Sequence, residues 1–185
     1  MRNFIALLCA VVWVLMPVAA RADVVVSFYS YDLDLGLTTH FPHAFVTMKG
    51  RLADGRAIDE NSGFTAKSVS PAILMGSVAG MIEVKPASYI NKSVRHFDIT
   101  VDDAHYAGIK AIEAKWRALP GKSYDLGKRN CIHFVAEIAA YLGLQVDLGK
   151  AYVKKPRAFL ERILALNPFL VAITPPRTPK KSKRG

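Results

Sequence analysis

The order of its secondary-structure patterns constrains the fold of this chain more than any other feature. Extended runs rich in β-branched and aromatic residues come first, at 24–31 and on both sides of Asp54-Gly55. Asp-Gly between two such runs predicts a β-hairpin. The stretch 71–79 is apolar and glycine-spaced and is typical of a loop, and further strands are predicted at 80–84 and 95–101.

Helical periods occupy the second half of the chain. A helix capped by Asp102 or Asp103 is predicted to end at Pro120-Gly121, because apolar residues recur in it every three or four positions. Residues 131–142, which Gly143 stops, and 156–166, which begin with proline, predict two more helices. Strands followed by helices predict an α+β domain with a mainly antiparallel sheet.

The two ends of the chain are predicted to lie outside that domain. Residues 1–22 combine Arg2, an apolar stretch and Ala20-Arg21-Ala22, which is typical of a secretory signal peptide cleaved after Ala22. An uncleaved anchor is the alternative, and we expect no membrane span after cleavage. Residues 23–174 then form a single domain, and 175–185 form a disordered basic tail.

The charge of the chain is concentrated in that tail. The whole chain carries a formal charge of +10, and the tail "PPRTPKKSKRG" supplies several of its basic residues. The charge therefore does not predict that the folded domain binds nucleic acid. In an exported protein such a tail suits weak contact with anionic lipid or wall polymer, and an inert solvated terminus is the alternative.

Cysteine usage narrows the chemistry. Cys9 lies in the predicted signal peptide, so Cys131 is the one cysteine expected in the mature chain. An intramolecular disulfide and a multi-thiolate metal site are then excluded, and we expect neither metal nor cofactor. Three interpretations remain for Cys131: an inert core thiol, an intermolecular bridge or a nucleophile.

The position of Cys131 favours a nucleophile. Cys131 would be the first residue of its helix, and Asn130 would be the N-cap. The thiol would lie on the same inward face as Phe134 and Ile138. A helix N-terminus favours the thiolate, so a depressed thiol pKa is predicted. Amide donors around residues 130 and 131 would also hold an oxyanion formed on a substrate carbonyl.

A cysteine nucleophile needs a base, and His43 is the favoured candidate. It begins an alternating strand that would hold its ring rigidly. His133 is two positions from the thiol on a helix and points away from it, where it would pair with Glu137. The weaker candidates are His40, His96 and His105.

The string "NCIHFV", with Tyr124 seven residues before Cys131 and an earlier strand "HAFV", resembles the circularly permuted papain-like cysteine hydrolases. These include permuted NlpC-type cell-wall amidases and lecithin:retinol acyltransferase-like enzymes. The resemblance covers about residues 24–145. It implies a papain-like antiparallel sheet packed against helices, with Cys131 as nucleophile at a helix N-terminus and His43 as base.

Papain-like sites orient the histidine with a third polar group. A tight two-residue hairpin loop would place Ala66, which cannot serve, opposite His43. The neighbouring candidates are Glu60, Asn61, Ser62 and Thr65, and we favour Asn61, because its amide would accept the imidazole N–H. A backbone carbonyl is the alternative.

The predicted function is an exported cysteine amidase or peptidase, periplasmic or secreted, that acts through a thioester. Expected export and the family resemblance suggest peptide crosslinks of peptidoglycan as substrate. A lipid amide or ester would suit the apolar stretch 72–84, which makes a lipid-directed acyltransferase or thioesterase an alternative. A non-catalytic envelope-binding module that uses the basic tail is another alternative.

Overall fold

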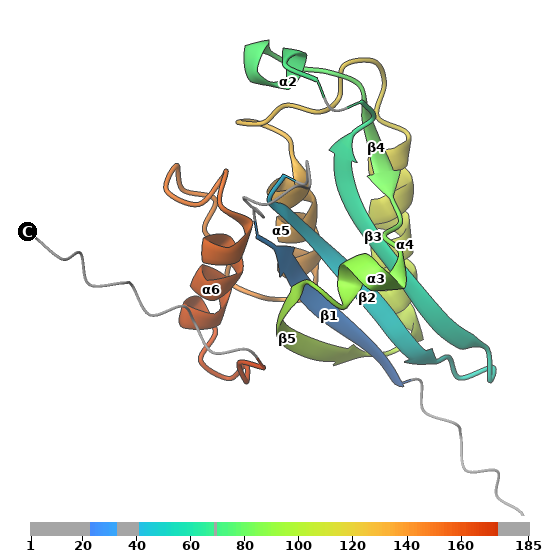
Figure 1. The fold of residues 1–185 in the computed structure, drawn as a ribbon. Coiled ribbons are helices and arrows are strands. Elements are labelled where there is room, and N and C mark those ends of the chain that lie inside the picture. Colours follow the sequence, from blue (N-terminus) through green and yellow to red (C-terminus); the bar gives the residue numbers. More distant parts are fainter. Residues whose placement is uncertain (1–22, 33–40, 69, 174–185) are drawn as a thin grey trace, which may run out of the picture.

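A five-stranded antiparallel sheet forms the centre of the computed structural model, which describes residues 23–32, 41–68 and 70–173 (Figure 1). The strand order is β4-β3-β2-β1-β5. The predicted α+β class, with an antiparallel sheet packed against helices, is confirmed. The strands are β1 (Asp23–Tyr31), β2 (His43–Arg51), β3 (Ala57–Ala66), β4 (Gly80–Glu83) and β5 (Val94–Val101).

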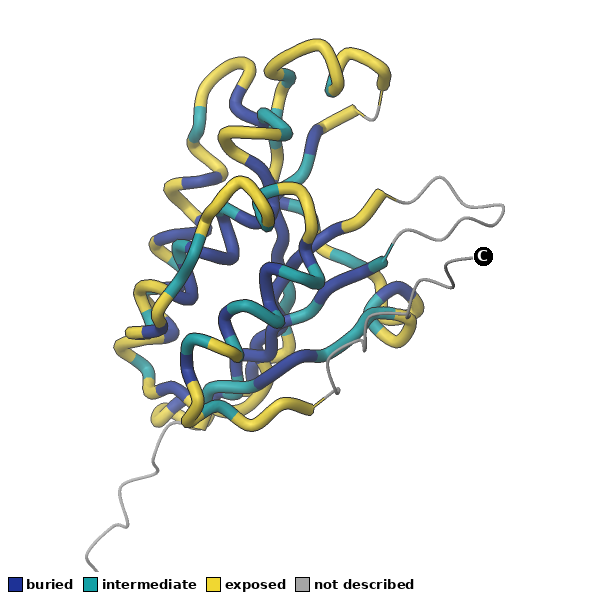
Figure 2. The backbone as a smooth tube through the Cα atoms, turned by 90° about the vertical axis from the view of Figure 1, so that its left-hand side faces the viewer, coloured by how far each residue is buried: buried dark blue, intermediate teal, exposed yellow. Residues whose placement is uncertain are grey.

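Three longer helices cover one face of this sheet, and a short helix lies on the other. Helices α4 (Asp103–Arg117), α5 (Cys131–Tyr141) and α6 (Pro156–Leu166) pack their apolar sides against the sheet and build the main core with it. Helix α3 (Ala87–Ile90) contributes Tyr89 to a small cluster on the opposite face. Figure 2 shows the buried segments gathered in the middle of the molecule and the exposed ones in the peripheral connections.

Strand alternation assigns each side chain of β2 to one of these faces. Ala44, Val46 and Met48 are fully buried in the main core beneath the helices. Phe45, between them in sequence, packs in the small cluster with Tyr89. Because successive side chains point to opposite faces, the helix face and the α3 face of the sheet are distinct chemical environments.

The hairpin between β2 and β3 differs from its prediction. Its loop spans residues 52–56, with Leu52 N–H donating to the Arg56 carbonyl at 3.0 Å, so it is longer than the tight two-residue turn. Thr47 therefore pairs with Asn61, one residue away from the predicted register. The prediction that Ala66 lies opposite His43 is wrong for this reason.

The other predicted strands and helices differ from the structure only at their ends. Asp102 caps α4 by accepting from the His105 N–H at 2.8 Å, and α4 ends at Arg117. Part of the predicted loop forms the one-turn helix α2 (Ala72–Met75). Among the described residues no helix has the length and apolarity that a membrane crossing needs. The predicted signal peptide and basic tail lie outside the described residues.

Candidate active site

Cys131 is the first residue of α5, as the sequence predicted, and its side chain faces inward. Only 4% of the residue is exposed, and it belongs to the main core together with Phe134, Val135 and Ile138. A thiol in this position lies beside the amide groups that begin the helix. Its surroundings, however, are those of a core residue.

Asn130 fixes the start of this helix. Its Oδ1 accepts from the amide groups of Ile132 at 2.8 Å and His133 at 3.3 Å. Its Nδ2 donates to the carbonyl groups of Leu126 at 2.7 Å and Val153 at 2.8 Å. Asn130 is buried, and its side chain makes all four of these hydrogen bonds. It therefore holds the start of α5 against the two connecting segments that precede and follow the helix.

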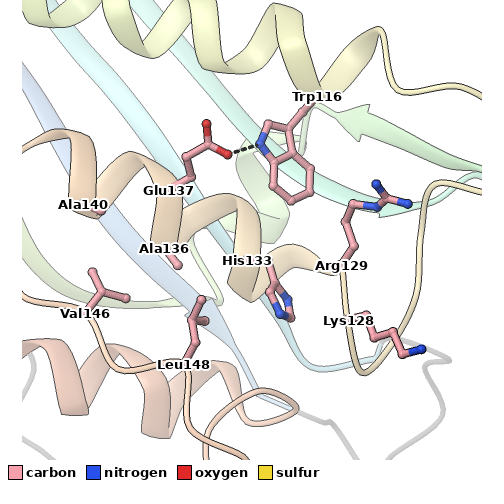
Figure 3. A pocket seen from close by; sticks show the side chains of 9 residues that line it. All are labelled: Trp116, Lys128, Arg129, His133, Ala136, Glu137, Ala140, Val146 and Leu148. Carbon is pink, nitrogen blue, oxygen red and sulfur yellow. Dashed lines mark hydrogen bonds between the residues drawn. The ribbon is translucent and has the colours of Figure 1, made fainter.

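His133 completes a capping box at the start of α5. Its Nδ1 accepts from the Asn130 N–H at 3.3 Å, so the Asn-x-x-His spacing has a structural explanation. The predicted pairing with Glu137 is wrong, because Glu137 binds Lys115 and accepts from Trp116 Nε1 at 2.8 Å. His133, Glu137 and Trp116 line a cavity of about 460 Å³ (Figure 3).

His43 is the first residue of β2 and is also buried, with 6% exposed. Its ring stacks beside Phe45 and lies over Gly63 of β3. A Cβ atom added at Gly63 would be 2.5 Å from His43 Nε2, so the missing side chain makes room for the imidazole. Within the described part of the chain, His43 Nε2 has no hydrogen-bond partner.

The sulfur of Cys131 lies beside the backbone that follows His43. A backbone hydrogen bond from Ala44 acts on the thiol, and the β2–β3 ladder ends nearby at Val46–Ser62. The imidazole leaves β2 on the α3 face. Lys85 acts electrostatically on both Cys131 and His43, and Cys131 acts on Tyr89 of the α3-face cluster. The structure therefore brings Cys131 and His43 to the same end of β2.

Burial keeps both groups neutral. It raises the pKa of the Cys131 thiol to about 11, because desolvation outweighs the backbone hydrogen bonds and the charge of Lys85. The predicted depressed thiol pKa is wrong for this reason. Burial and, to a smaller extent, repulsion from Lys85 lower the pKa of His43 to about 3.

Burial therefore disfavours a preformed thiolate–imidazolium pair, because desolvation raises the pKa of the thiol and lowers the pKa of the imidazole. Neutral imidazole and neutral thiol are therefore the resting forms.

Asn61 has a different task from the one predicted. Its Oδ1 accepts from the Lys85 N–H at 2.7 Å, and its Nδ2 donates to the Lys85 carbonyl at 3.1 Å. No hydrogen bond joins Asn61 to His43 in the described ranges, so its catalytic role stays a prediction without geometric support. Two of the other polar candidates are also engaged elsewhere: Glu60 binds Lys110, and Ser62 donates to Glu113.

Residues that the sequence did not single out surround His43 instead. Gly63 leaves space for its ring, and Glu83 pairs with Gly63 across β3 and β4. Lys85 binds Glu83 at 2.6 Å and is largely buried. Sequence analysis could have found these residues only by predicting that β3 pairs with β4. The pattern of strands along a sequence does not specify which strands pair. No group of three or more His, Cys, Asp or Glu side chains among the described residues is arranged to hold a metal.

Comparison with known proteins adds one structural likeness. No protein-family model and no curated protein matches the sequence. A crystal structure described as the type VI secretion system effector TseH is similar, with 14% identity and a TM-score of 0.48. The match covers 78% of this chain and 88% of that chain. The case for a function therefore rests on the residues of this chain.

Proposed function

We propose that this protein is an exported cysteine hydrolase, an amidase or peptidase, with Cys131 as nucleophile and His43 as base. One observation carries the proposal. The buried thiol stands at the first residue of a rigidly capped helix, beside the backbone that follows a histidine whose Nε2 has no partner among the described residues. A cysteine that only fills space in the core would not need to stand at a helix start or next to an imidazole.

The proposed reaction begins from the neutral pair. His43 takes the thiol proton as the Cys131 sulfur attacks the substrate carbonyl, so the proton moves together with C–S bond formation. The amide of Cys131 is the first-turn donor that the Asn130 cap leaves for the oxyanion. His43 then protonates the leaving amine, which yields a thioester. Water, deprotonated by His43, attacks the thioester and releases the carboxylic acid and the thiol.

Peptide crosslinks of peptidoglycan are the proposed substrate class, on the strength of the expected export and the family resemblance. One observation favours the lipid-directed alternative. Large apolar side chains are exposed in α2 and directly after β4, namely Leu74 at 77%, Met75 at 88% and Val84 at 68%. An acyl chain or a membrane surface would cover such side chains.

The test compares hydrolysis by the purified protein and its variants on crosslinked peptidoglycan fragments and on phospholipid vesicles. Cys131→Ala and His43→Ala should abolish hydrolysis. His105→Ala is the matched control, because His105 is an exposed histidine bonded to Asp102, and it should retain full activity. Mass spectrometry should detect an acyl group on Cys131. Hydrolysis that survives Cys131→Ala refutes the proposal, and activity on vesicles alone selects the lipid-directed alternative.

A further inference from the structure

The unpartnered nitrogen of His43 marks an incomplete site. Nε2 is a buried polar atom without a hydrogen bond to any described residue. A neutral imidazole that accepts a proton at its other nitrogen becomes a cation, and a buried cation requires an acceptor or a counter-charge. A group able to meet that requirement must lie on the α3 face of the sheet, beside Gly63.

Glu83 is the acid in that place. It pairs directly with Gly63 across the β3–β4 ladder, and directly opposed residues of antiparallel strands share a face. His43 Nε2 lies over Gly63, at 2.5 Å from the position a Cβ would take. Since Gly63 has no side chain, the space between the imidazole and the Glu83 carboxylate is not filled from β3.

Lys85 holds this carboxylate in the structure. Its Nζ is 2.6 Å from Glu83 Oε2 and 4.5 Å from the centre of the Tyr89 ring. Asn61 clamps the Lys85 backbone through both atoms of its side-chain amide. Among the described residues, the titratable groups on this face near His43 are Glu83, Lys85, Tyr89 and Tyr31, and Glu83 is the carboxylate in that set.

We propose that Glu83 is the positioning residue for His43 and that Lys85 competes with His43 for its carboxylate. As the Cys131 proton moves to Nδ1 of His43, the Nε2–H donates to Glu83, and no proton leaves the site. While Glu83 stays on Lys85, the thiol and the imidazole remain neutral, so the Lys85–Glu83 pair regulates the site. The part of this proposal that concerns the reaction rests on the proposed function.

The test measures the protonation of His43 by NMR in the full-length protein, with the resonance assigned through His43→Gln. Lys85→Met should raise the His43 pKa by at least about one unit, a tenfold gain in proton affinity. Part of that rise reflects the loss of a nearby cation. The double variant Lys85→Met/Glu83→Gln lacks the same cation and also lacks the Glu83 carboxylate, so it isolates the contribution of Glu83. In this variant most of the rise in the His43 pKa should be lost.

A matched control exists on the other face of the sheet. Lys110→Met frees Glu60 from an ion pair of the same length, 2.6 Å, and should leave the His43 pKa unchanged. Lys85→Gln is a second neutral variant in case Lys85→Met does not fold. An equal rise with and without Glu83 overturns the proposal. No substrate enters this experiment, so failure to find hydrolysis would refute the proposed function and leave this result standing.

Discussion

Replacing Gly63 with alanine should disable the site with little loss of stability. The added methyl carbon would be 2.5 Å from His43 Nε2, 3.2 Å from His43 Cε1 and 3.0 Å from Phe45 Cβ. Ordinary van der Waals contacts between carbon atoms are about 3.5–4.0 Å, so the imidazole must move by roughly 1 Å. The ring is the far end of a side chain and can swing, whereas the strand backbone cannot.

These contacts determine whether Gly63→Ala mainly lowers the stability of the protein or mainly lowers the reactivity of the site. A core that must accept an extra methyl group typically loses about 1–3 kcal/mol, and a swinging ring places Gly63→Ala near the lower limit. A catalytic group displaced by about 1 Å costs on the order of 100-fold in rate. The loss of reactivity should therefore greatly exceed what the loss of stability explains.

The assay follows acylation of Cys131 by p-nitrophenyl acetate through the release of p-nitrophenolate, alongside thermal unfolding of the same samples. Gly127→Ala is the matched control, because its nearest neighbouring atom would be 3.7 Å from the new carbon. It should behave as wild type in both measurements. If Gly63→Ala acylates at the wild-type rate with His43 still in place, the reasoning from the close contact is refuted.

Three further predictions concern stability and titration. Asn130→Ala should lower the free energy of unfolding by about 2–4 kcal/mol in urea titrations, since it removes a helix cap and two buried donors, and an unchanged urea midpoint would contradict this. Alkylation of Cys131 by iodoacetamide should rise with a midpoint near pH 11, and an inflection below about pH 8 would show that the helix terminus outweighs burial. His43 and His96 have pKa values lowered from 6.5 to about 3 and about 4, so the unfolded chain binds protons at pH values where the folded protein does not. The free energy of unfolding should therefore fall by about 1.4 kcal/mol per pH unit for each histidine as the pH drops below 6.5. The fall ends when His96 and then His43 protonate in the folded state. A urea midpoint that is equal at pH 7 and pH 5 would contradict this prediction.

Local patterns predicted the elements that carry the site. The start of α5 at Cys131 followed from Asn130 as a cap and from the apolar period that begins with the thiol. His43 at the head of a strand followed from alternation. These features depend on residues within a few positions of one another, so the sequence contains the information directly.

Register was harder to predict because it depends on loop geometry. The loop over 52–56 shifted β3 by one residue against β2 and placed Asn61 opposite Thr47. The pairing of β3 with β4 then brought Glu83 beside Gly63, a neighbour separated from it by twenty positions in sequence. A shift of one residue reverses the faces of a strand, so a list of polar candidates near the hairpin could not include Glu83, which we propose as the residue that positions His43.

The amino-acid sequence by itself determined the α+β class, the helix-start position of Cys131 and the position of His43 at the head of a strand, because these follow from local periodicity and capping. Only the tertiary structure decided the burial of the site and the strand pairing from which Glu83 is proposed as its third member. Desolvation of Cys131 and His43 arises from the packing of α5 against β2, and that burial outweighs the helix terminus. The position of Glu83 depends on strand pairing, which becomes defined only when the whole sheet is assembled.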